Sequence, residues 1–213
     1  MTYKEMQDEA IAARFNESYR PRVQRWINLR HARLWGFAEW PFKKSTRQAA
    51  NGDASSSITV ALLGRVLHLE RASDGEPLTY MAPGDFQDTW PGGTLSPSGV
   101  PDTFTVINRV VYYRPLAPSA AFNIAFESRL SHLADGVTLT AGSMNSDNDT
   151  PVFDEAYHPL LVIGATATGL KMENDPTWGA LEQEFDAGLQ AMVEELCPPD
   201  HATTLQYGRD SFW

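Results

Sequence analysis

The chain has 213 residues, of which 42% are hydrophobic and 11% aromatic, and a formal net charge of −10. This composition excludes an intrinsically disordered chain, and the length fits one domain or two small ones. The single cysteine, Cys197, excludes an internal disulfide. No apolar run approaches the roughly 20 residues of a membrane span, and the charged N-terminus does not read as a signal peptide. We therefore expect a soluble protein, made in the cytoplasm, with no membrane partner.

The charge is unevenly distributed along the chain. Residues 1–50 contain ten Lys and Arg against five Asp and Glu, whereas residues 135–200 contain thirteen acidic residues and one basic residue, Lys171. Such an acidic surface does not favour nucleic-acid binding through counterion release. The two segments are suited to pair with each other, within a subunit or between neighbours. The other interpretation, which we favour for any one residue, is that both are solvated faces.

The N-terminal region predicts two helices. Thr2 to Glu5 has the form of a capping box, which opens a helix that runs to Phe15. Pro21 suits the first turn of a second helix, which ends at Gly36. The apolar side of this helix carries Val23, Trp26, Ile27 and Leu34, and its other faces carry Arg22, Arg25, Arg30 and Arg33. Tryptophan beside arginine also suits stacking on single-stranded nucleic acid, but the helical spacing of the tryptophans favours a core.

The middle of the chain predicts a small antiparallel β region. An extended segment begins at Trp40, a polar loop covers 51–57, and one helical turn is expected at 86–90. Alternation and β-branched or aromatic runs predict strands at 58–62, 66–70, 78–81, 104–107, 110–113 and 122–126. We expect the last three strands to form an antiparallel meander. The pattern does not assign a secondary structure to residues 128–140.

The C-terminal part returns to helices and ends in a tail. Pro159 lies in the first turn of a helix that runs to about Asn174. Asp175 and Pro176 open a last helix, whose apolar residues recur every three or four positions from Trp178 to Leu196. The tail ends on Phe212 and Trp213, an aromatic pair that is unfavourable in water unless something covers it.

No motif predicts catalysis, a metal or a cofactor. The five histidines are dispersed, and none has metal-ligand spacing. The stretch from Gly164 to Gly169 resembles the start of a phosphate loop, but it lies inside a predicted helix, where backbone amides are not free. Its small residues favour close approach of a neighbouring helix. Asp147-Asn148-Asp149 suggests calcium, but the residues that follow lack an acidic ligand, so a solvated loop is favoured.

These elements predict an α+β protein. N-terminal and C-terminal helices form one helical bundle, a small antiparallel β region is inserted between them, and an extended C-terminal tail follows. The expected segments are 1–36 for the N-terminal helices, 37–140 for the β region, 141–197 for a C-terminal helical hairpin and 198–213 for the tail.

Three stretches follow each other in an order that carries more information than any one of them. They are Trp40-Pro41-Phe42, the run from Gly99 to Phe104 with the proline-punctuated strands after it, and the segment from Asp154 to Ala165. Over residues 5–196 this order resembles the head-to-tail adaptor, or connector, proteins of tailed bacteriophages. The chain departs from the pattern of these proteins at two prolines. The proline usually found just before Asp154-Glu155 is displaced to Pro151, and Pro159 lies inside the helix that follows, where these proteins often have another residue. Both departures affect the first turn of that helix.

The resemblance implies a structural virion protein of the head–tail neck, assembled in the host cytoplasm, with no enzymatic activity and no cofactor. It implies a homo-oligomeric ring, usually a dodecamer, that binds the portal protein and a tail or nozzle protein. Double-stranded DNA would pass through its channel without specific binding. The candidate assembly contacts are Arg22, Arg25, Arg30, Arg33, Tyr207, Phe212 and Trp213. The alternatives are another neck or tail component, such as a tail terminator or nozzle-side protein, and a β-rich hydrolase or carbohydrate-binding module.

Overall fold

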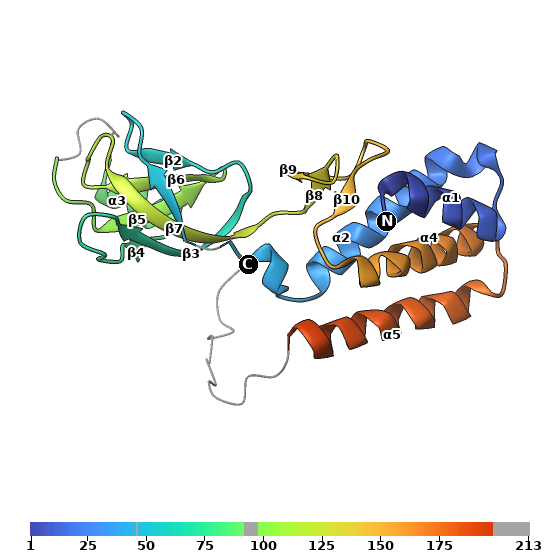
Figure 1. Ribbon diagram of the computed structural model, residues 1–213. Helices are drawn as coiled ribbons and strands as arrows, with labels where there is room; N and C mark the ends of the chain where they lie inside the picture. Colours follow the sequence, from blue (N-terminus) through green and yellow to red (C-terminus); the bar gives the residue numbers. More distant parts are fainter. Residues whose placement is uncertain (46, 92–97, 198–213) are drawn as a thin grey trace. The chain divides into compact units, whose positions relative to one another are not determined.

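The computed structural model of the protein describes residues 1–45, 47–91 and 98–197 (Figure 1). The expected α+β class is confirmed, because helices from the two ends of the chain pack together and small sheets lie between them in sequence. The chain forms two compact units. The division into 1–36, 37–140, 141–197 and 198–213 stays a prediction, and the tail lies outside the described residues. In the described part of the chain, no helix is long and apolar enough to span a membrane.

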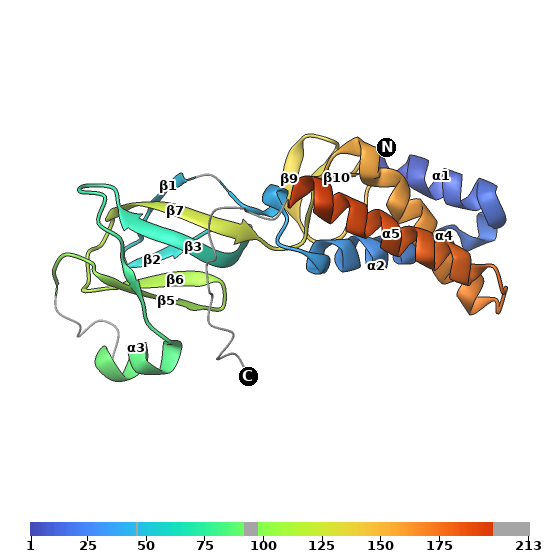
Figure 2. The ribbon, with the colours of Figure 1, turned by 90° about the horizontal axis from the view of Figure 1, so that it is seen from below.

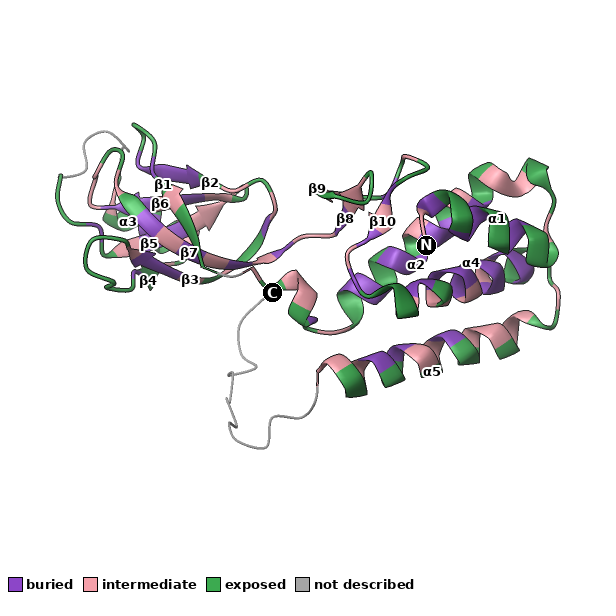
Figure 3. Cartoon of the chain, viewed as in Figure 1, coloured by how far each residue is buried: buried purple, intermediate pink, exposed green. Residues whose placement is uncertain are grey.

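The helical unit comprises Gln7–Pro41 and Ala156–Trp213, of which the structure describes the part up to residue 197. Its helices are α2 (Arg20–Phe37), α4 (His158–Met172), α5 (Trp178–Leu196) and the part of α1 (Tyr3–Arg14) from Gln7 onward. Helix α4 packs against both α2 and α5. Of the apolar stripe predicted for the last helix, Phe185, Leu189 and Met192 are buried, whereas Trp178, Leu181 and Leu196 are half-buried. Figure 3 shows buried and exposed positions alternating along α5.

Glycines of α4 bring its neighbours close. A Cβ atom at Gly164 would lie 2.9 Å from side-chain atoms of both Arg30 and Phe185. A Cβ atom at Gly169 would lie 2.4 Å from Phe15 and 2.5 Å from Trp26. Because real Cβ atoms do not approach other atoms so closely, these positions require glycine. The stretch from Gly164 to Gly169 therefore serves helix packing, as its place inside a predicted helix indicated.

The β unit comprises Met1–Met6 and Phe42–Glu155. Its three sheets have the strand orders β1-β7-β3, β2-β6-β5-β4 and β10-β8-β9. The strands are β1 (Gln48–Asn51), β2 (Ser57–Thr59), β3 (Leu63–Arg71), β4 (Thr79–Tyr80), β5 (Thr103–Ile107), β6 (Val110–Arg114), β7 (Ala121–Ser128), β8 (Ser131–Ala134), β9 (Thr138–Ala141) and β10 (Thr150–Pro151). All pairs are antiparallel except β4 with β5. The short helix α3 (Pro83–Thr89) lies next to β5 (Figure 2).

The predicted meander is wrong in its last pairing. Strands β5 and β6 form a hairpin, but β7 pairs with β1 and β3 in another sheet. The two sheets share one buried core, in which the rings of Tyr113 on β6 and Phe122 on β7 lie 4.6 Å apart. Two facing sheets bury the apolar sides of both strands, whereas a lone three-stranded meander would leave that side in water.

The structure also corrects the region from 40 to 62. Pro41–Lys43 form a short 3-10 helix where an extended segment was predicted. Strand β1 was not predicted, because its residues Gln48–Asn51 are mostly exposed and lack apolar alternation; its pairing with β7 makes it a strand. The strand predicted at 58–62 ends at Thr59.

The loop before β10 holds the N-terminus of the chain within the β unit. The backbone N–H of Tyr3 donates to the carbonyl of Asp149 at 2.7 Å, and that of Lys4 donates to the carbonyl of Asp147 at 3.1 Å. Thr2 and Glu5 bond each other's backbone N–H groups, which confirms the predicted capping box. In the first turn of α1, the N–H groups of Tyr3 and Lys4 are thus bound by the loop, and that of Glu5 is bound by the cap.

Replacement of Gly169 by alanine tests the close packing of α4. We expect Gly169→Ala to lower the free energy of unfolding by about 1–3 kcal/mol, because the new methyl group overlaps Phe15 and Trp26. The matched control is Gly179→Ala in α5, where nothing lies within 4 Å of the added Cβ. The control should be neutral or stabilising by up to about 1 kcal/mol. Urea denaturation measures both, and equal effects of the two substitutions would contradict the packing argument.

Candidate functional site

An ion-pair cluster links three helices of the helical unit. Arg30 of α2 is buried, and its guanidinium donates to both carboxylate oxygens of Glu182 on α5, at 2.8 and 2.6 Å. The Nε–H of Arg30 donates to the hydroxyl of Thr168 on α4 at 2.8 Å. This hydroxyl in turn donates to the backbone carbonyl of Gly164 at 2.9 Å. The bidentate geometry is the strongest form of Arg–carboxylate pairing.

Arg33 extends the cluster to the surface. Its guanidinium donates to Glu182 and, at 2.7 Å, to Asp186. The guanidinium carbons of Arg30 and Arg33 lie 4.9 and 5.2 Å from the centre of the Phe185 ring. Residues three or four positions apart share one face of a helix, so α2 presents both arginines, and α5 presents Glu182, Phe185 and Asp186, to the same region.

Glu182 is the anion at the centre of this cluster. Hydrogen bonds from Arg30, and then from Arg33, outweigh the effect of burial and hold the pKa of the Glu182 carboxyl below its ordinary value. A carboxylate that stays ionised between two guanidinium groups is a poor proton donor or acceptor near neutral pH. The cluster therefore acts as a structural clamp between α2 and α5.

The structure brings together two of the seven predicted contact residues. Arg30 and Arg33 meet in the cluster with α5, so for them the pairing of opposite charge occurs within one subunit. Arg22 and Arg25 are exposed on α2, and within the described part of the chain neither forms an ion pair. The guanidinium of Arg22 lies 5.3 Å from the centre of the Tyr19 ring. Tyr207, Phe212 and Trp213 lie outside the described residues.

Sequence reasoning did not single out the partners of these arginines. Glu182 and Asp186 are one helical turn apart and flank Phe185 of the predicted apolar stripe. That spacing was the available signal, because it places two carboxylates at the edge of a buried face. Thr168 gave no signal of its own, since a threonine inside a helix usually bonds its own backbone.

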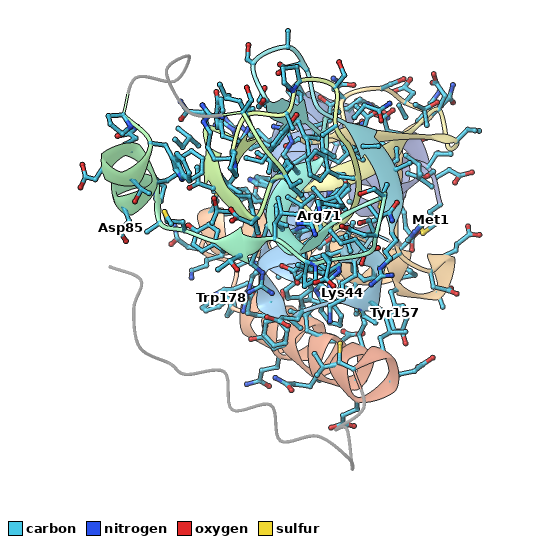
Figure 4. All side chains as sticks on the ribbon, turned by 90° about the vertical axis from the view of Figure 1, so that its left-hand side faces the viewer. Met1, Lys44, Arg71, Asp85, Tyr157 and Trp178 are labelled. Atoms are coloured by element: carbon cyan, nitrogen blue, oxygen red, sulfur yellow. The ribbon has the colours of Figure 1, made fainter. Side chains whose placement is uncertain are left out.

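Other polar clusters fix loops of the β unit. Asp149 is buried, and its carboxylate accepts from the backbone N–H groups of Asn145 at 2.8 Å and Ser146 at 2.9 Å. Burial alone would raise the pKa of Asp149, but these amides and the nearby His132 outweigh it and lower the pKa. Arg71, labelled in Figure 4, donates to Asp74 and to the carbonyl of Pro101. Among the residues that the structure describes, no group of three or more His, Cys, Asp or Glu is arranged to hold a metal ion.

A protein family matches the chain over nearly its whole length. The family model described as SU10 adaptor protein matches residues 1–209, which includes every described residue of both units. No curated protein matches the chain.

Removal of Glu182 tests the clamp. We expect Glu182→Ala to lower the free energy of unfolding by about 3 kcal/mol, because it leaves the buried Arg30 without a counter-charge. The matched control is Asp186→Ala, whose side chain is 48% exposed and whose partner Arg33 is 41% exposed. An exposed pair contributes about 1 kcal/mol or less. Chemical denaturation at pH 7 distinguishes the two, and similar losses would contradict a central role of Glu182.

The same cluster gives a pH dependence of known sign. Because the pKa of Glu182 is lowered in the folded state, its stabilisation is present above the ordinary Glu pKa of about 4.3 and is lost as pH falls through the lowered value. Glu182→Gln should therefore differ most from the wild type near neutral pH and least near pH 3. A difference that is constant across this range would contradict the assignment.

Proposed function

The chain belongs to the SU10 adaptor protein family, and from this premise we propose that it forms the ring between the portal and the tail of a bacteriophage virion. The observation that carries the proposal is the family match over residues 1–209. The family that the sequence resembles is thereby confirmed, and the protein is a structural adaptor of a phage. The ring, its usual number of twelve subunits, its binding to the portal and to a tail or nozzle protein, and the passage of DNA are our proposals.

The charge of the chain supports the proposed ring. A closed ring requires two different patches that meet head to tail, and one chain with a basic and an acidic part can supply both. The acidic excess, with a net charge of −10, also suits a channel wall, because it repels DNA phosphate and lets the duplex move without sticking. We place the protein in the neck of the virion, assembled in the host cytoplasm.

Mixing the purified chain with the portal protein of the same virus tests this function. We expect electron microscopy of the mixture to show a ring of this protein on the tail-facing end of the portal. The absence of any ring would overturn the proposal. Binding to tail components without binding to the portal would assign the chain to another neck or tail role, such as a tail terminator.

The C-terminal tail provides a separate prediction. Deletion of residues 207–213 removes Tyr207, Phe212 and Trp213, which we propose to contact the portal or a neighbouring subunit. We expect the circular dichroism spectrum and melting temperature to be unchanged and portal binding to weaken about tenfold or more, as when aromatic anchors are lost from an interface. Thr203→Ala with Thr204→Ala in the same tail is the control, and should bind normally. If the truncated chain unfolds, these aromatic residues belong to its own core instead.

A further inference from the structure

A groove lies between α1, α4 and α5 of the helical unit. Its volume is about 350 Å³, and apolar side chains from all three helices line it, among them Ala13, Val162, Ile163, Ala180 and Leu181. Glu9 and Arg14 border it with opposite charges. An apolar groove of this kind on a water-soluble bundle suits an apolar side chain from another surface.

Helix α5 continues the border of this groove with a face of small and acidic residues. Ala180 lines the groove, and the exposed residues that follow at helical spacing are Glu184, Ala187, Ala191 and Glu195. These positions lie on the side of α5 away from the buried Phe185 and Leu189, and Glu184 and Glu195 lie away from the Arg30 cluster as well. Alanine on an exposed helix face allows a second helix to approach closely, and the glutamates give that approach a negative border.

Helix α2 presents the complementary face. Leu29 is 55% exposed, and it lies between the exposed Arg25, one turn before it, and the exposed Ala32. Arg22 is exposed one turn before Arg25. Arg20 pairs with Asp8 and Glu17, and Arg30 and Arg33 pair with α5 of their own subunit. Arg22 and Arg25 are therefore the arginines of α2 that remain available for another surface.

We propose that this outward face of α2 packs against the groove and the exposed face of α5 in a second copy of the chain. Leu29 would enter the apolar groove beside Ala180, and Arg25, one turn from Leu29, would face Glu184, one turn from Ala180. The two patches differ, so the contact is heterologous and can be repeated around a ring. The inference rests on the proposed ring and names the surfaces that build it. Opposite charge around an apolar centre fixes both the partner and its register.

Engineered cysteines test the contact directly. In a Cys197→Ser background, one preparation carries Leu29→Cys and another carries Ala180→Cys, and the two are mixed at high concentration under mild oxidation. Cys197 is the single natural cysteine, so a disulfide between the two preparations reports one contact. In the control mixture, Ala54→Cys, at an exposed alanine of the β unit, takes the place of Leu29→Cys. We expect the Leu29→Cys mixture to yield at least fivefold more cross-linked heterodimer than this control. Equal yields would overturn the proposal.

Charge reversal adds a second readout. Arg25→Glu should reduce the Leu29→Cys to Ala180→Cys cross-link severalfold, and Glu184→Arg in the partner should restore it. Restoration excludes a folding defect as the cause of the loss. If Ala180→Cys instead cross-links to Trp213→Cys in its own chain, the groove holds the C-terminal tail and the proposal is wrong.

The experiment separates this inference from the proposed function. Rings on the portal in which the cysteine pair does not cross-link would overturn the interface and leave the adaptor function standing. A cross-link in the isolated chain together with no ring on the portal would support the contact as self-association and overturn the portal ring.

Discussion

The helical unit depends on one buried cation. Arg30 lies among α2, α4 and α5, and a buried guanidinium is strongly unfavourable unless a carboxylate and further acceptors surround it. Glu182 and Thr168 meet this need from two other helices, which sets how α2 and α5 lie along α4. Gly164 completes the arrangement, because any side chain there would collide with Arg30 and Phe185. The same constraint engages Arg30 and Arg33 within the subunit.

The β unit is organised by a different principle. Two sheets bury their apolar sides against each other, and this arrangement, not any polar pair, assigns β6 and β7 to separate sheets. Its buried polar groups, such as Asp149, bind backbone amides and so shape loops. The loop before β10 also holds the first residues of the chain. Hydrogen bonds of this kind fix the loops of the unit. Among its described residues, no group of three or more His, Cys, Asp or Glu is arranged to hold a metal ion.

Much of the fold was predictable where local patterns decide it. The stripe from Trp178 to Leu196 and the capping box at Thr2 act through near neighbours, so sequence alone located both helices. The pairing of β7 was not predictable in this way, because the choice of partner strand depends on how two sheets bury a common core. The strand β1 exists only because β7 lies beside it. The sequence left open whether the basic and acidic segments pair with each other or are solvated, and the identity of Glu182 as the shared partner of Arg30 and Arg33 needed the packing of three helices.

Charge within the helical unit holds α2 and α5 together, and we propose that the outward face of α2 and the groove at α5 form contacts between subunits. Amide hydrogen exchange, compared between the isolated chain and the chain bound to its portal, measures this most directly. We predict added protection on assembly in residues 20–29 and in the segments 9–14 and 177–184, with the centre of α4 equally protected in both states. Protection gained only in the β unit, with these three segments unchanged, would contradict the account.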